Sequence, residues 1–464
     1  MIRFFRHYVP ASILLLVITE AVILGSAIYL GAGLRFSGDT PLLQTADSLL
    51  PTALLFTITM LLLMAAFGLY DIEWRWGIKN LLLRLGLAFG LGLMIMAQMF
   101  YFIPSFSLGR GAFLLGFGVS LAGVMLARLG YLQWANLNTL KSRVLVLGTG
   151  SRAVRVEEIL AKRGPSCGIH VVGYIPAGGT HHFVPHERIL QTDAPLSDLV
   201  DRHQVNEILL AVRDRRGGGL PIADLLECKL RGVRVTELST FFERENGHLQ
   251  LDSMNASWMI LGEGFHQGML RDTIKRVFDL TVSLMLLAAT SPIMLITAIL
   301  IKLESQGPVF YRQERVGQHG RPFPIFKFRS MRTDAEKDGR PQWAKKNDDR
   351  VTRVGRFIRR TRIDELPQVF NVFMGEMSFV GPRPERPYFV ADLNRQIPYY
   401  GVRHTVKPGI TGWAQVRYPY GASIEDALEK LQYDLYYVKN HSLFLDLMIL
   451  TQTAQVVLLG KGAR

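Results

Sequence analysis

Two adjacent acids, Asp364 and Glu365, are the residues whose surroundings point most clearly to chemistry. Cationic side chains precede them at Arg356, Arg359, Arg360 and Arg362. A carboxylate can attack phosphorus and form an acyl phosphate, and nearby positive charge keeps it ionised. The pair could also hold Mg²⁺, which prefers carboxylate oxygens and substrate phosphates. The alternative is an acid pair at a helix N-terminus, where negative charge opposes the helix dipole.

Further cations stand on both sides of the acid pair. Lys327 and Arg329 are two residues apart in a predicted strand, so their side chains project to one face, as a phosphate site requires. Arg383 lies between two prolines, which stiffen the backbone and make it a good fork for phosphate. For the first pair, a solvated basic strand is the alternative.

The glycine-rich segment 407–416 reads Lys-Pro-Gly-Ile-Thr-Gly-Trp-Ala-Gln-Val and predicts a turn. A backbone of this kind can approach a base or a sugar closely. The segment also offers an aromatic ring and, at Gln415, an amide. Gln415 is therefore a candidate substrate contact, and a plain turn is the alternative.

An apolar stretch at 280–301 precedes these motifs and is long enough to cross a membrane. Basic residues flank it: the next segment, 302–362, holds 17 Lys and Arg against 7 Asp and Glu, which favours the cytoplasmic side. Near its centre, Pro292 removes a helical hydrogen bond and kinks the chain, and the hydroxyl of Ser291 can take up part of the freed bonding. We predict a re-entrant helix-break-helix at 274–303, with a kinked spanning helix as the alternative.

Four earlier apolar stretches predict transmembrane helices, at 11–33, 48–70, 81–103 and 112–134. Lys and Arg concentrate before the first stretch, between the second and third, and after the fourth. The N-terminus and the chain after the fourth span are therefore expected in the cytoplasm. Glu20 places a charge near the centre of the first span, as a polar contact between helices or as a functional group.

Residues 143 to about 245 alternate between strand and helix patterns, which predicts a parallel α/β sheet. The predicted strands are 144–147, 170–175, 207–212 and 233–238, with a helix ending at Arg163 after the first. Gly148-Thr-Gly-Ser-Arg-Ala153 is similar to the dinucleotide fingerprint, but the acid that would hold a ribose is absent. Bound NAD remains an alternative to a module kept for packing, oligomerisation or regulation.

The expected fold class is therefore a membrane α/β protein with three domains. They are a four-helix transmembrane domain at 1–140, a Rossmann-like α/β module at 141–262 and a monotopic α/β catalytic domain at 270–464. The net charge of +14 favours an anionic partner, such as nucleic acid, anionic lipid or a phosphorylated substrate, and no recognition module for nucleic acid is recognisable. The two cysteines, Cys167 and Cys228, form neither a metal motif nor a disulfide framework.

Five motifs run in order through residues 271–464, and together they resemble the bacterial sugar transferase family, the polyprenyl-phosphate hexose-1-phosphate transferases. The four spans and the module resemble its large members and, more loosely, the exopolysaccharide-associated branch. The motifs are the basic helix with Ser291-Pro292, Lys-Phe-Arg-Ser-Met at 327–331, Asp-Glu-Leu-Pro-Gln at 364–368, Gly-Pro-Arg-Pro at 381–384 and Gly-Ile-Thr-Gly-Trp-Ala-Gln-Val at 409–416.

The resemblance implies a two-step reaction at the cytoplasmic face of the bacterial inner membrane. Asp364 would attack the β-phosphate of a UDP-sugar and release UMP, and the aspartyl phospho-sugar would pass to undecaprenyl phosphate, the first membrane step of exopolysaccharide synthesis. Glu365 would assist as Mg²⁺ ligand or proton acceptor, and Lys327, Arg359 and Arg383 would hold phosphates. Glucose is the sugar expected, with galactose and N-acetylhexosamines as alternatives, and a homodimer is plausible.

Arg362 departs from the family pattern, where a small hydroxyl residue is common. Two other classes of function are weighed against the transferase. A membrane-tethered NAD-dependent epimerase or dehydratase is disfavoured by the missing acid and by the lack of a Tyr-x-x-x-Lys pair beside the module. A non-catalytic scaffold of polysaccharide assembly would tolerate Asp364→Asn.

Overall fold

The structure is a computed structural model. It describes residues 2–4, 7–36, 42–70, 78–106, 108–135, 142–163, 168–177, 183–190, 194–212, 220–251, 264–265, 268–333, 350–418, 421 and 423–459. These residues form two compact units, one built from Pro10–Ile58 and Met99–Met254, the other from Ile2–Val9, Thr59–Gln98 and Asn255–Arg464. Each unit is described on its own.

Helices lie where all four spans are predicted: α1 (Ala11–Phe36), α2 (Leu42–Ala66), α3 (Ile78–Phe102) and α4 (Arg110–Ala135). Among the described residues, five helices are long and apolar enough to cross a membrane, and the fifth is α10 (Met269–Glu304). Helix α2 ends because Gly68, with φ of 70°, takes the left-handed conformation common after a helix C-terminus. A short 3-10 turn, η1 (Pro104–Phe106), follows α3.

Helices α1 and α4 of the first unit pack closely through glycines. A Cβ atom on Gly31 would lie 2.4 Å from the backbone nitrogen of Gly116, so only glycine permits this approach. The carboxylate of Glu20 forms an ion pair of 2.7 Å with the Nε of Arg128, and both side chains are fully buried. This pair favours the structural interpretation of Glu20, a polar contact between helices.

The module of the first unit is a four-stranded parallel sheet in the order β4-β3-β5-β6, as the sequence predicts. The ends of its strands lie within two residues of the predicted ends. The elements are β3 (Ser142–Leu147), α5 (Ser151–Arg163), β4 (Ile169–Ile175), η3 (His186–Arg188), α6 (Leu196–Arg202), β5 (Glu207–Leu210), α7 (Ile222–Leu230), β6 (Arg234–Glu237) and α8 (Leu238–Asn246).

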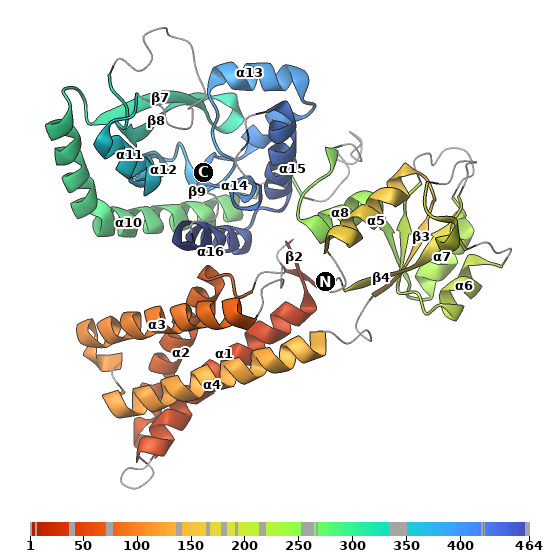
Figure 1. Cartoon of the computed structure of the whole chain (residues 1–464), viewed down its shortest axis with the longest axis horizontal. Helices are drawn as coiled ribbons and strands as arrows, with labels where there is room; N and C mark the ends of the chain where they lie inside the picture. The colour runs from red at the N-terminus through yellow and green to blue at the C-terminus, as the bar shows by residue number, and fades with distance from the viewer. Residues whose placement is uncertain are drawn as a thin grey trace. The chain divides into compact units, whose positions relative to one another are not determined.

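Both faces of this sheet are covered by helices, which explains the continuous apolar strands. Val144 and Val146 pack with α5 and α8, whereas Leu145 and Leu147 pack with α6 and α7 on the opposite face (Figure 1). Cys228 is a buried core residue there, and Cys167 lies outside the described residues. The module is therefore doubly wound, the architecture of nucleotide-binding folds.

The second unit contains the candidate site within a small α/β arrangement (Figure 1). Two strand pairs organise it: the antiparallel pair β7–β8 and the parallel pair β9–β10. The elements are β7 (Phe310–Val316), η5 (Gln318–Gly320), β8 (Pro322–Phe328), α11 (Arg353–Arg360), η6 (Ile363–Glu365), α12 (Gln368–Met374), β9 (Ser378–Val380), α13 (Pro387–Gln396), η7 (Tyr400–Thr405), β10 (Gly409–Thr411), α14 (Trp413–Arg417), α15 (Ile424–Asn440) and α16 (Leu443–Leu459).

Helix α10 corrects one detail of the sequence prediction, because it is not interrupted at Ser291-Pro292. Figure 1 shows it instead as one helix whose two limbs meet at a corner. Pro292 lies inside the helix and cannot donate to the carbonyl of Ala288, and the hydroxyl of Ser291 donates to that carbonyl at 3.0 Å. The serine thus satisfies the carbonyl that proline leaves free, so the helix bends without breaking.

The C-terminal helix α16 is anchored to the second unit through its first turn. Asp446 is fully buried and accepts hydrogen bonds from Lys275 at 2.6 Å and from the hydroxyl of Tyr437 at 2.8 Å. The N-terminal hairpin of β1 (Ile2–Phe4) and β2 (His7–Val9) belongs to the same unit, where the ring of His7 hydrogen bonds to Tyr436 at 2.7 Å.

Candidate active site

The two limbs of α10 position different walls of the candidate site. Near the first limb, Asp279 accepts hydrogen bonds from the hydroxyl of Ser378 and the backbone N–H of Phe379, which fixes β9 just before the Gly-Pro-Arg-Pro motif. In the second limb, Ile301 packs in one cluster with Phe328 of β8. One bent helix therefore supports both the strand that carries Lys327 and the segment that carries Arg383.

The acid pair lies in a tight 3-10 turn rather than at the start of an α-helix. Arg362 has φ of 62°, a left-handed conformation that costs an arginine on the order of 1 kcal/mol. This conformation turns the chain, and the N–H of Glu365 then donates to the carbonyl of Arg362 at 3.2 Å. The helix-dipole alternative for the acids consequently does not describe their setting.

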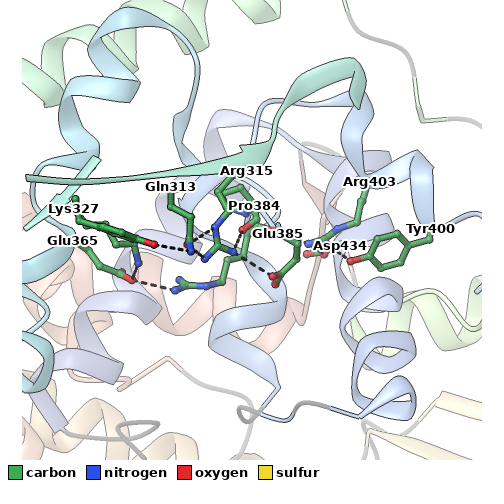
Figure 2. A network of polar contacts seen from close by, with 11 residues as sticks. Gln313, Arg315, Lys327, Glu365, Pro384, Glu385, Tyr400, Arg403 and Asp434 are labelled. Carbon is green, nitrogen blue, oxygen red and sulfur yellow. Dashed lines mark hydrogen bonds and ion pairs between the residues drawn. The ribbon is translucent and has the colours of Figure 1, made fainter. Parts of the chain in front are cut away.

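Glu365 is held by two cations that approach the same oxygen. Its Oε1 accepts from the Nζ of Lys327 at 2.9 Å (Figure 2). The same oxygen accepts from a guanidinium nitrogen of Arg383 at 3.0 Å. Burial would raise the pKa of Glu365, but the charges of Arg383 and Lys327 outweigh it and hold that pKa well below its usual range. Glu365 is therefore a fixed anion at neutral pH.

Asp364 has the opposite environment, although it is the neighbouring residue. It is 9% exposed, and its Oδ1 has no hydrogen-bond partner among the described residues. Burial and the charge of Glu365 raise the pKa of Asp364 to about 6, against the opposing charges of Lys327, Arg362 and Arg359. A buried, unpaired carboxylate oxygen beside cations is a group that lacks its partner.

The structure brings together four of the predicted site residues and adds the charge of a fifth. Lys327, Asp364, Glu365 and Arg383 form one cluster, and Arg359 is close enough to lower the pKa of Asp364. Burial also lowers the pKa of Lys327, in spite of its pairing with Glu365. The cluster therefore combines one fixed anion, one unpaired carboxylate and several cations, as phosphoryl transfer requires.

Arg329 lies one residue beyond β8 and points elsewhere. Its guanidinium donates to the carbonyls of Ser305 and Gln306, at 2.8 and 2.9 Å, directly after the C-terminus of α10. Side chains in a regular strand would have placed it beside Lys327, but β8 ends at Phe328. Through these contacts Arg329 stabilises the backbone at the C-terminus of α10. Its binding of phosphate stays a prediction.

Gln415 lies in the short helix α14, and its amide nitrogen donates to the carbonyl of Ile410 in its own loop at 3.3 Å. Its Oε1 is buried without a hydrogen-bond partner among the described residues. No hydrogen bond of Gln415 to the acid pair occurs within this part of the chain. Its contact with a substrate therefore also stays a prediction.

A second buried network that the sequence does not reveal supports Arg383. Arg403 donates to the backbone carbonyl of Arg383 at 2.9 Å and pairs with Asp434 at 2.7 Å and the hydroxyl of Tyr400 at 2.6 Å (Figure 2). Arg403 and Asp434 are nearly fully buried. Arg383, Arg403 and Asp434 are at least twenty residues apart in sequence, so no spacing indicates that they act together. The signal that the sequence offers is an arginine shortly before the glycine-rich segment.

Asp364 and Glu365 could bind Mg²⁺ together with substrate phosphates, but not as a complete metal site made of protein side chains alone. No group of three or more His, Cys, Asp or Glu that could hold a metal occurs among the described residues. Asp364 nevertheless has an orphaned oxygen, and both ion pairs of Glu365 meet at one oxygen, Oε1. Mg²⁺ commonly takes one or two carboxylates and fills its remaining positions with water and substrate phosphates.

Comparison with known proteins places this cluster in a family. The model of the family described as bacterial sugar transferase matches residues 270–460. An Aeromonas hydrophila protein named UDP-N-acetylgalactosamine-undecaprenyl-phosphate N-acetylgalactosaminephosphotransferase is 44% identical over 240 residues, 52% of this chain and 56% of that protein. The undecaprenyl-phosphate glucose phosphotransferase of Komagataeibacter xylinus is 44% identical over 194 residues, 41% of this chain and 36% of that protein.

A shorter relative is covered more fully. The UDP-glucose:undecaprenyl-phosphate glucose-1-phosphate transferase of Caulobacter vibrioides is 42% identical over 194 residues, 41% of this chain and 72% of that protein. The chain thus spans only about half or less of the first two relatives, but most of the third. Every residue of the cluster around Asp364 lies inside the matched region, and on this basis the chain belongs to the bacterial sugar transferase family.

Proposed function

We propose that the chain transfers a sugar-1-phosphate from a UDP-sugar to undecaprenyl phosphate and releases UMP. The names of the relatives support this class of reaction. The observation that carries the proposal is the carboxylate of Asp364: buried, with one oxygen unpartnered, next to a glutamate that already has two cations. Such an oxygen is available to bond to phosphorus.

In the first step, an oxygen of Asp364 attacks the β-phosphorus of the UDP-sugar. A new carboxylate-oxygen-to-phosphorus bond forms, the bond from the β-phosphorus to the oxygen bridging the two phosphates breaks, and UMP leaves with that oxygen. Lys327 and Arg383 stabilise the charge that develops on the phosphoryl oxygens. Since both already bind Glu365, that glutamate keeps them in position before the substrate arrives.

In the second step, a phosphate oxygen of undecaprenyl phosphate attacks the phosphorus of the aspartyl phospho-sugar. The bond from that phosphorus to Asp364 breaks, the carboxylate returns to its starting state, and undecaprenyl-diphospho-sugar leaves. The surrounding cations Lys327, Arg359 and Arg362 favour the carboxylate as a leaving group, because they stabilise its anionic form.

Asp364 and Glu365 are the residues that would hold Mg²⁺ together with the substrate phosphates. When bound, the ion would neutralise phosphate charge and polarise phosphoryl oxygens. The expected result of chelation with EDTA is loss of UMP release that added Mg²⁺ restores. Full turnover in EDTA would remove the metal from the proposal and leave the aspartyl step in place.

The bend of α10 supports a re-entrant placement in the inner membrane, with the acid pair on the cytoplasmic face. Two limbs joined at a corner allow both ends of the helix to stay on the side where the basic flanks favour them. In this placement the cations lie near the lipid headgroups, where a water-soluble donor can reach a lipid phosphate. Cysteine labelling at each end of α10 in intact spheroplasts tests this topology, and labelling of one end from outside would mean a span.

The names of the relatives contain two sugars, glucose and N-acetylgalactosamine, and both are candidates here. We propose that the transfer is the first membrane step of exopolysaccharide synthesis. The decisive experiment incubates purified protein with each UDP-sugar in the absence of lipid acceptor. The expected products are stoichiometric UMP and a sugar-phosphate adduct on the peptide that contains Asp364, found by mass spectrometry. UDP as product would indicate a glycosyltransferase instead, and no product with any sugar would favour the scaffold.

A further inference from the structure

A cavity of about 130 Å³ lies beside the first limb of α10, and the proposed reaction does not use it. Lys275, Arg276, Lys407 and His441 line it, together with two aspartates of α10. None of the acid-pair cluster, neither Asp364 and Glu365 nor their two cations, is among its lining residues. A second group of cations, separate from the acid-pair cluster, therefore lines this cavity.

Two of the three main cations are already bound to the protein. Lys275 pairs with the buried carboxylate of Asp446 at 2.6 Å, and Arg276 donates two hydrogen bonds of 2.7 Å to carbonyls at the end of α12. Lys407, by contrast, makes neither a hydrogen bond with its side chain nor an ion pair within the described part of the chain. Its ammonium group is thus the free donor of the cavity.

The acids of the cavity do not neutralise Lys407 through direct pairing. Asp279 is occupied with Ser378 and the N–H of Phe379, and Asp272 is exposed in the first turn of α10. Burial and the neighbouring Arg276 lower the pKa of Lys407 despite both aspartates. An anion in the cavity would supply the charge that this half-buried ammonium lacks.

The backbone holds Lys407 at a crossing of two loops. The N–H of Ser378 donates to the carbonyl of Pro408 at 2.9 Å, and the N–H of Gly409 donates to the carbonyl of Pro382 at 3.0 Å. A Cβ atom on Gly381 would lie 2.3 Å from the carbonyl oxygen of Lys407, so only glycine fits there. Lys407 is consequently fixed by the same segment that carries Arg383.

Size and surroundings select the kind of anion. Sites for whole small molecules usually measure about 300–1,000 Å³, so the cavity is too small for a nucleotide-sugar but has room for a phosphate group. From the cavity onward, α10 exposes apolar side chains at Ile274, Val277, Leu284 and Met285. An apolar tail attached to the phosphate could lie along them.

We propose that this cavity binds the phosphate group of a lipid, with Lys407 as its principal ligand and the lipid tail along the first limb of α10. Undecaprenyl phosphate and an anionic phospholipid share this chemistry. If the occupant is undecaprenyl phosphate, the cavity is the acceptor site of the transferase, and this assignment rests on the function proposed above. The site would hold the lipid phosphate beside Lys407, whose loop is hydrogen bonded to the segment that carries Arg383.

The test compares Lys407→Met, Lys407→Arg and, as matched control, Lys302→Met, which removes an exposed lysine from the other end of the same helix. Each is reconstituted in nanodiscs of neutral phosphatidylcholine. Loss of one charge-assisted contact predicts a KM for undecaprenyl phosphate that rises about ten- to a hundredfold in Lys407→Met. Lys407→Arg should recover most of it, Lys302→Met should change it less than twofold, and acceptor-independent UMP release should stay within twofold in all three.

The second arm identifies the occupant. If a phospholipid fills the cavity, phosphatidylglycerol activates the wild type but not Lys407→Met, and the KM for undecaprenyl phosphate is unchanged. An unchanged KM without any difference in lipid activation would overturn the proposal, as would an equal fall in acceptor-independent UMP release, which would indicate a displaced Arg383. Thermal unfolding with undecaprenyl phosphate and no UDP-sugar tests binding without turnover: a shift in Tm for wild type but not for Lys407→Met supports the site even if the transferase reaction fails.

Discussion

The sugar transferase region (residues 270–460) and the Rossmann-like module (residues 142–251) each bury a carboxylate among charged side chains, but they complete it differently. In the module, Glu207 is 2% exposed and accepts from the hydroxyl of Thr236 and from Arg244 at 2.7 Å. In the transferase region, Asp364 is 9% exposed and leaves Oδ1 without a hydrogen-bond partner among the described residues.

The difference distinguishes a carboxylate that stabilises the fold, Glu207, from one that is suited to bind a ligand, Asp364. The protein itself supplies the partners of Glu207, so nothing further has to bind. At Asp364 the neighbouring cations are shared with Glu365, and burial costs free energy that only a substrate or a metal would return. Removing the two carboxylates should therefore have opposite consequences for activity and stability.

The largest effect is expected for Asp364→Asn. In the proposed reaction this variant lacks the nucleophile, so acceptor-independent UMP release should fall at least about a thousandfold. Its stability should not fall, because the raised pKa means that ionised Asp364 destabilises the fold. Denaturant unfolding should show the variant equal to wild type or more stable by up to about 3 kcal/mol at pH 7.5.

The sign of that stability difference has a definite pH window. A carboxyl group whose folded pKa is about 6 and whose unfolded pKa is near 3.9 begins to destabilise the fold above about pH 4, and the effect is complete above about pH 6. The advantage of Asp364→Asn should therefore vanish below about pH 4. Asp392→Asn, which alters an exposed carboxylate of α13, is the control and should change neither quantity. A clear loss of stability in Asp364→Asn at pH 7.5 would mean that the carboxylate is a structural group like Glu207.

The second effect concerns Lys327, which pairs with Glu365 and lowers the pKa of Asp364. Lys327→Met should lower the rate of UMP release about a hundredfold, because a phosphate-stabilising charge is lost. It should also raise the apparent pKa of the acid limb of the pH profile, since Lys327 lowers the pKa of Asp364. Lys327→Arg keeps the positive charge, so it should restore the pKa of the acid limb more fully than the rate of UMP release. An unchanged pKa in Lys327→Met would contradict the electrostatic coupling.

The third effect belongs to the module. Glu207→Gln keeps an acceptor for Thr236 but removes one of the two carboxylates around Arg244, whose Nε still pairs with Glu245 at 2.8 Å. The expected cost is about 2 kcal/mol of unfolding free energy, with kcat for folded protein unchanged. A fall in kcat at full folding would indicate that the module communicates with the site, and the comparison would then lose its meaning.

Sequence reasoning predicted most of the fold because those elements depend on local patterns. Apolar runs located the strands of the module, with Val144 and Leu145 facing opposite cores, and length with hydropathy located the helices α1 to α4. At the site, the dense cations before Asp364 and Glu365 identified the acid pair without any structure. These cations and the two acids lie within ten residues of each other, so their pattern can be seen in the sequence alone.

The remaining features are set by tertiary contacts that no spacing encodes. Strand β8 ends one residue before Arg329, so this arginine closes α10 instead of joining Lys327. The left-handed turn at Arg362 decides that two adjacent acids have different environments. Arg403 reaches the carbonyl of Arg383 across twenty residues of sequence. For Arg329 and Arg403, the hydrogen-bond partner comes from a distant segment.

The smallest effect is the pH dependence of the first half-reaction in the wild type. In the proposed reaction only ionised Asp364 attacks phosphorus, and with a pKa of about 6 its ionised fraction falls roughly tenfold between pH 7 and pH 5. The single-turnover rate of UMP release without acceptor should fall by the same factor, and measuring this half-reaction alone excludes titration of the lipid phosphate. A rate that stays constant down to pH 5, in protein shown to remain folded, would mean that Asp364 is paired after all and that the contrast between the two carboxylates is wrong.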